Sequence, residues 1–198
     1  MEAMLTSDQE FQLKRQRAQR NLMWLGIVSI IMIFAGLTSA YIVRRGAGNW
    51  FQITLPDVFK ISTAVIILSS VTMNFSLWSF RRNKVRAGSL FLGATLVLGL
   101  AFAWFQFEGW RLLTEGGVYL VHQKGQTSLV SGSFIYMLSG LHLAHLAGGI
   151  IALLFILIRS FFGAYGANNV HGIRVVSIYW HFLDLLWIYL FVFLTIYK

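Results

Sequence analysis

Five long apolar runs, separated by short polar segments, make up most of this 198-residue chain. Each run is close to the ~20 residues that a helix needs to cross a lipid bilayer. Transmembrane strands are about 10 residues long and alternate polar with apolar positions, which these runs do not. The pattern predicts an all-α membrane protein, a bundle of five transmembrane helices over about residues 22–43, 61–80, 87–107, 134–158 and 175–197.

The ends of these runs define the expected organisation of the chain. Residues 1–21 are polar and charged, and we expect a cytoplasmic N-terminal segment that is either a short surface helix or disordered. The first run exceeds the ~7–15 apolar residues of a secretory signal peptide, so we interpret it as an uncleaved span. The only proline, Pro56, lies between the first two runs and kinks neither. Residues 22–198 are predicted to form one transmembrane domain.

The composition agrees with this class of protein. Hydrophobic residues make up 57% of the chain and charged residues 12%, against about 25% charged residues in soluble domains. The chain has no cysteine, which excludes disulfides and thiolate metal sites. The net charge is +9, but the basic residues flank the apolar runs. That placement is typical of membrane topology and of contact with anionic lipid, so we expect no nucleic-acid partner.

The distribution of Lys and Arg predicts the orientation, because cytoplasmic loops of membrane proteins carry an excess of these residues. With the N-terminus inside, ten basic residues lie in inner segments and six in outer ones. The inner residues are Lys14, Arg15, Arg17, Arg20, Arg81, Arg82, Lys84, Arg86, Arg159 and Arg174. We therefore expect the N-terminus inside and the C-terminus outside.

An imidazole and a carboxyl group interrupt the last apolar run. His181 and Asp184 are three residues apart, so a helix places them on one face. Ionisable groups at membrane depth are costly and are usually paired or functional. We expect the two side chains to pack together or to bond to a neighbouring helix. The alternative is a small ion transporter centred on Asp184. We disfavour it because the sequence has no inverted repeat and no other charged residue within the spans.

Two more histidines, His142 and His145, lie three residues apart in the fourth run. Together with His181 they could ligate a haem b in a membrane electron carrier. Metal sites in helix bundles draw their ligands from several helices, and here His181 and Glu108 are the obvious further donors. We favour hydrogen bonds from both histidines to neighbouring helices or backbone carbonyls, and expect no metal in this chain.

Three other features have a packing interpretation beside a functional one. Gly140, Ala144 and Gly148 form a row of small residues that predicts close helix packing. Glu108 is either a buried functional carboxylate or an interfacial acid paired with Arg111. For seven polar residues of the second run we prefer interhelical packing to a polar pathway. They are Ser62, Thr63, Ser69, Ser70, Thr72, Asn74 and Ser76.

From about Trp24 to its C-terminus, the chain resembles subunit III of the haem–copper respiratory oxidases, in its short five-helix bacterial form. The most specific stretch, Tyr179–Trp187, is similar to the family signature Y-W-H-F-x-D-x-x-W. Residues 140–145 resemble its G-x-H-x-x-H helix. Three further stretches, 34–41, 68–73 and 106–110, resemble family segments in the same order.

The resemblance implies a non-catalytic subunit that docks against subunit I of a proton-pumping cytochrome c or quinol oxidase in a bacterial cytoplasmic membrane. Haem and copper are then expected in partner subunits alone, with phospholipid bound to this chain. Arg159 matches a family arginine that contacts a lipid headgroup, although an ordinary topology-setting charge would look the same. The family usually carries a buried glutamate in its first span. Ile30 stands there in this chain, so no role of that carboxylate is carried over.

Overall fold

The computed structural model describes residues 2–46, 50, 52–120, 130–163, 165–167 and 169–197. The described chain forms α1 (Glu2–Arg45), α2 (Val58–Arg81), α3 (Val85–Glu115), α4 (Val130–Phe161) and α5 (His171–Ile196). Each helix contains a stretch long and apolar enough to cross a membrane, and no strand forms among the described residues. The predicted all-α, five-helix fold is confirmed.

Helix α1 differs most from the prediction. It begins at Glu2 and continues through the polar N-terminal segment into the first span without a break. Residues 2–25 contain no glycine or proline and are rich in Glu, Gln, Lys and Arg, all of which favour helix. The segment is therefore the beginning of a long helix, where the sequence predicts a separate short helix or disorder.

Helices α2 and α3 form an antiparallel hairpin joined by residues 82–84. Asn83 turns the chain with a left-handed φ of 58°, a conformation that asparagine tolerates better than most residues. Hydroxyl groups connect the two helices along their length. Ser76 Oγ donates to the Gly88 carbonyl at 2.9 Å, and the Thr72 and Thr95 hydroxyls lie 2.8 Å apart.

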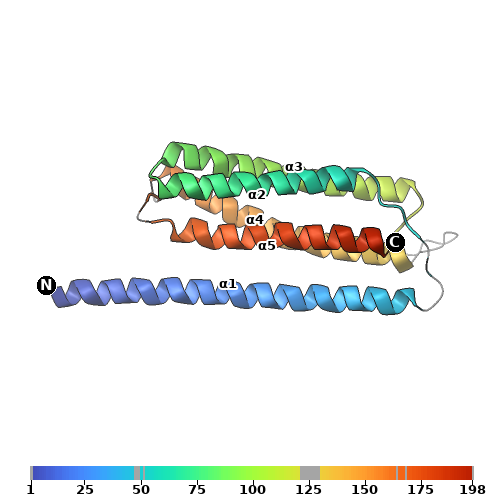
Figure 1. The fold of residues 1–198 in the computed structure, drawn as a ribbon, viewed down its shortest axis with the longest axis horizontal. Helices are drawn as coiled ribbons and strands as arrows, with labels where there is room; N and C mark the ends of the chain where they lie inside the picture. The colour runs from blue at the N-terminus through green and yellow to red at the C-terminus, as the bar shows by residue number, and fades with distance from the viewer. Residues whose placement is uncertain are drawn as a thin grey trace.

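The remaining helices build onto this hairpin. Helix α4 packs on α3, and α5 packs on both α2 and α4. Among the described residues, α1 packs on α4 and α5 alone, and it runs along one side of the bundle (Figure 1). The N-terminus and the C-terminus lie toward opposite ends of the bundle, as an odd number of crossings requires (Figure 1).

The side chains divide into a closed interior and an apolar exterior. Phe102, Leu146 and Trp180 are fully buried where the helices meet. Large apolar side chains on the outer faces, such as Met32 and Ile151, are mostly exposed. On a soluble protein such a surface marks an interface. Around five spanning helices it is the surface that lipid or partner helices cover.

Candidate functional site

Three side chains of the α5 signature bond to hydroxyl groups on α2. The indole nitrogens of Trp180 and Trp187 donate to Ser69 Oγ and Thr63 Oγ1, each at 3.0 Å. Between them, His181 Nδ1 lies 2.6 Å from Ser70 Oγ. Trp180 and Trp187 are two helical turns apart, so they share one face of α5. The signature therefore joins the last helix to the second.

The same segment also fixes α5 to α3 and α4. Tyr179 donates its hydroxyl hydrogen to the His145 carbonyl of α4 at 3.1 Å. The ring of Trp180 lies against two glycines. A Cβ atom on Gly99 of α3 would come within 2.6 Å of that ring, and one on Gly149 of α4 within 3.3 Å. The position of the Trp180 ring therefore depends on glycine at residues 99 and 149.

Asp184 lies inside the bundle, with 3% of its surface exposed. Its carboxyl group is beside the Ser70 hydroxyl, but neither carboxyl oxygen makes a well-formed hydrogen bond within the described part of the chain. His181 and Asp184 thus share Ser70 as a neighbour. When His181 carries its proton on Nδ1, Ser70 accepts that proton's hydrogen bond, and its own hydroxyl hydrogen is available to Asp184.

The two histidines of α4 lie in different surroundings. His142 is fully buried, with its ring centroid 5.9 Å from that of Phe102 and 5.2 Å from that of Trp187. Neither of its nitrogens has a hydrogen-bond partner among the described residues. His145 Nδ1 lies 2.8 Å from the carbonyl oxygen of Leu141 in its own helix.

No group of three His, Cys, Asp or Glu side chains that could hold a metal ion occurs in the ranges that the structure describes. His142, His145, His181 and Glu108 are therefore not brought together there as one ligand set. Glu108 instead accepts a hydrogen bond from Arg111, which also approaches Glu115 at 3.7 Å. This ion-paired arrangement is the second of the two alternatives that the sequence leaves open for Glu108.

The predicted row of small residues lies away from the tightest helix contacts. Ala144 and Gly148 are exposed, and Gly140 is half-buried. A Cβ on Gly140 would be 3.8 Å from the Trp110 ring, and one on Gly148 would be 4.0 Å from the Tyr179 hydroxyl. Against α5, the closer contact on α4 is made by Gly149, the neighbour of Gly148.

The polar residues of α2 serve two helices at once. Six of the seven bond across a helix interface: Ser62, Thr72 and Ser76 to α3, and Thr63, Ser69 and Ser70 to α5. The seventh, Asn74, is exposed and donates to the Ser70 carbonyl. The interpretation as interhelical contacts is confirmed for these six residues and is wrong for Asn74.

Sequence reasoning missed Gln106 as an interior residue. Its side chain is fully buried on α3, where Nε2 donates to Ser62 Oγ at 3.0 Å and Oε1 has no partner among the described residues. One helical turn later, Trp110 donates to Ser139 of α4 at 2.9 Å. A lone amide within an apolar run is the signal that could have indicated this contact, since buried amides need partners.

Arg159 is exposed at the end of α4, beside a cleft of about 630 Å³ between α1, α4 and α5. Arg15 of α1 lines the same cleft, whose apolar walls include Leu22, Phe155 and Val175. Burial raises the pKa of the nearby Tyr165 hydroxyl, while the Arg159 charge acts in the opposite direction. The cleft therefore combines cationic groups with apolar surface.

Ile30 of α1 is 8% exposed and belongs to the hydrophobic core. The position where the family usually carries a glutamate is thus filled by a packed aliphatic side chain.

Five apolar helices with a hydrogen-bonded interior define a multi-pass membrane protein. Residues 12–198 match the family described as Cytochrome c oxidase subunit III. The chain belongs to the cytochrome c oxidase subunit III family, as the signature in α5 indicates. It is therefore a subunit of an oxidase and works with other oxidase subunits.

Individual relatives also match most of the chain. The chain is 33% identical to a probable cytochrome c oxidase subunit 3 of Mycobacterium leprae, over 86% of this chain and 82% of the relative. It is 34% identical to a protein of the same description from Nocardia farcinica, with the same coverage. A probable quinol oxidase subunit 3 of Staphylococcus saprophyticus is 24% identical over 85% of this chain and 83% of that protein.

Proposed function

We propose that this chain is the non-catalytic subunit III of a proton-pumping respiratory terminal oxidase that reduces oxygen to water. It supports the catalytic subunit I, its main contact, through helix packing, bound lipid and the environment of proton uptake. Haem and copper belong to the partner subunits in this proposal. The relatives include both cytochrome c and quinol oxidase subunits, so we assign binding of the electron donor to other chains.

The observation that carries this proposal is the use of the α5 signature to hold helices together. Trp180, His181 and Trp187 each bond to a hydroxyl of α2. These three polar groups are engaged with a neighbouring helix, which supports a structural role for the signature. We interpret His181 and Asp184 as a buried polar lock, and His142, His145 and Glu108 as structural residues. A rigid scaffold suits a subunit that preserves the shape of its neighbour.

The cleft at Arg159 is the proposed site of a bound phospholipid. A guanidinium group can hold a phosphate through two parallel hydrogen bonds, and Arg15 adds a second cation across the cleft. Leu22, Phe155 and Val175 offer apolar contact to the acyl chains. The clustering of basic residues supports N-inside orientation in a bacterial cytoplasmic membrane, which puts this cleft on the cytoplasmic side.

Deletion of the chain from the assembled oxidase tests the proposed function. The complex would be purified with and without this chain, and its haem content, initial oxygen consumption and proton uptake compared. We expect unchanged haem content, slower proton uptake and a faster loss of activity during sustained turnover. A stoichiometric haem absorption band in the purified single chain would contradict the proposal, as would a complex whose proton uptake and durability do not change.

A further inference from the structure

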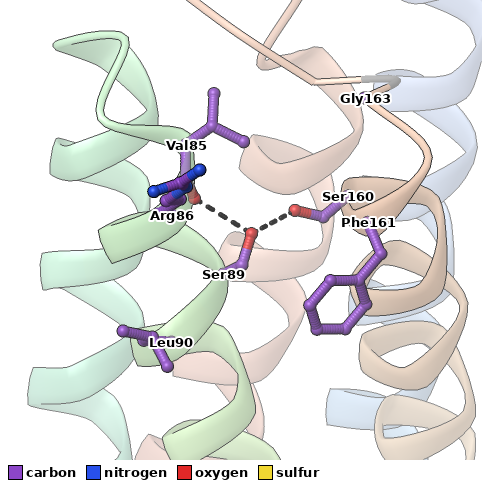
Figure 2. Close-up of a pocket in the computed structure, with 7 residues that line it drawn as sticks. All are labelled: Val85, Arg86, Ser89, Leu90, Ser160, Phe161 and Gly163. Carbon is purple, nitrogen blue, oxygen red and sulfur yellow. Dashed lines mark hydrogen bonds between the residues drawn. The ribbon is translucent and has the colours of Figure 1, made fainter.

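A second groove lies between the beginning of α3 and the end of α4 (Figure 2). Its volume is about 460 Å³, within the ~300–1,000 Å³ of typical small-molecule sites. The residues that line it are Val85, Arg86, Ser89, Leu90, Ser160, Phe161 and Gly163. None of them lines the cleft at Arg159, so the two are separate sites.

The two serine hydroxyls that line the groove already have hydrogen-bond partners within the protein. Ser89 Oγ donates to the Val85 carbonyl at 2.9 Å, so Ser160 donates its hydroxyl hydrogen to Ser89 (Figure 2). Both serines are buried. Leu90 and Phe161, by contrast, are 75% and 74% exposed. The groove thus presents apolar surface that is open to the surrounding bilayer, which suits an acyl chain better than a polar molecule.

The charge around the groove is positive. Arg86 is exposed and has no ion-pair partner among the residues that the structure describes. Arg81 at the end of α2 and Arg82 and Lys84 in the α2–α3 connection add three more basic residues, and no acidic residue is among the described residues that line the groove. The start of α3 contributes about +0.5 charge and the end of α4 about −0.5, so the two helix ends roughly cancel. The basic side chains therefore determine the sign of the local field.

We propose that this groove binds an anionic phospholipid, with its phosphate at Arg86 and one acyl chain along Leu90 and Phe161. Basic pockets between transmembrane helices on the cytoplasmic side are suited to such headgroups. The occupant is a lipid of the bilayer, because the groove combines the exposed apolar side chains of Leu90 and Phe161 with the cationic Arg86. The α4 end thereby holds lipid on two sides, at Arg159 and at Ser160–Phe161.

The test counts the lipids that the purified, delipidated oxidase complex retains, by native mass spectrometry during titration with phosphatidylglycerol or phosphatidylcholine. Arg86→Gln should weaken phosphatidylglycerol binding about fivefold, the factor equivalent to the ~1 kcal/mol of one basic residue near an anionic surface. Binding of phosphatidylcholine should not change. Leu90→Trp, which fills the groove from an exposed position, should lower retention of phosphatidylglycerol.

Two controls make the result specific. Arg81→Gln removes the same charge from the end of α2, outside the groove, and should weaken binding less than Arg86→Gln does. Arg86→Gln should weaken phosphatidylglycerol binding by the same factor in an Arg159→Gln background. That result would show that the groove and the cleft at Arg159 bind lipid independently. Equal losses in Arg81→Gln and Arg86→Gln would overturn the proposal, as would wild-type binding of phosphatidylcholine as strong as that of phosphatidylglycerol.

Discussion

Trp180 contacts three other helices at once. Its indole nitrogen donates to Ser69 of α2, and its ring packs against Gly99 of α3 and Gly149 of α4. A single large side chain of α5 therefore lies between three other helices and contacts each of them. This explains why a tryptophan and two distant glycines belong to one structural unit.

A double-mutant cycle would measure the bond between Trp180 and Ser69. Interhelical hydrogen bonds in membranes average ~0.6 kcal/mol and reach about 1.7, so Trp180→Phe and Ser69→Ala should show a coupling energy in that range. The measurement is reversible unfolding of the purified chain in mixed micelles. The exposed Trp104→Phe variant is the matched control and should change the free energy of unfolding little. Strictly additive effects of the two substitutions would rule out the bond.

Whether ionisation of Asp184 is needed for oxygen reduction can be tested with a side chain that cannot ionise. Asparagine keeps the size of the side chain and its polar contact with Ser70, and no ion pair within the described residues depends on the charge. We expect Asp184→Asn to leave oxygen consumption by the assembled complex within about twofold, or ~0.4 kcal/mol in activation free energy. A more than tenfold loss in a fully assembled complex would show that Asp184 carries protons during turnover.

At the scale of whole helices, α2 is the polar centre of the bundle. Its hydroxyl groups point to α3 on one side and to α5 on the other, so it links two helices that are far apart in sequence. The sequence indicates that α2 packs through these groups. The sequence does not show which hydroxyl bonds to α3 and which to α5. That depends on where the two neighbouring helices lie around α2, and the hydroxyl-bearing residues themselves are chemically alike.

Helix spacing gives a matched prediction on α3. A Cβ on Gly99 would come within 2.6 Å of the Trp180 ring, whereas a Cβ on Gly93 would meet nothing within 4 Å. Gly99→Ala should therefore destabilise the chain by about 1–3 kcal/mol through overpacking. Gly93→Ala should be neutral or stabilising, because alanine favours helix more than glycine does. Chemical denaturation of both variants checks the difference, and equal stabilities would refute the close packing.

At the scale of the whole molecule, α1 is the helix that packs least extensively against the others. It packs on α4 and α5, partly through Tyr41, whose hydroxyl donates to the Tyr197 carbonyl at 3.1 Å. Tyr189 of α5 donates to Thr38 at 3.2 Å. The remaining surface of α1 is available to lipid or to another subunit.

The orientation can be tested directly because the chain contains no cysteine. Single cysteines would be introduced as Lys84→Cys in the α2–α3 connection and as Glu115→Cys at the end of α3. In right-side-out vesicles, a membrane-impermeant maleimide should label the cysteine at 115 at once and the one at 84 after permeabilisation. The opposite labelling pattern would reverse the predicted N-inside topology.

The sequence by itself determined the number of helices, their approximate spans and the family. These follow from the length of apolar runs and from short motifs, which are local properties of the chain. The tertiary structure alone decided that His181 bonds to Ser70, that Gly149 makes the close contact beside the predicted Gly140–Gly148 row, and that Gln106 lies inside. Such pairings depend on the rotation and register of antiparallel helices. Those are fixed by the shapes of residues from distant parts of the chain, which no local pattern contains.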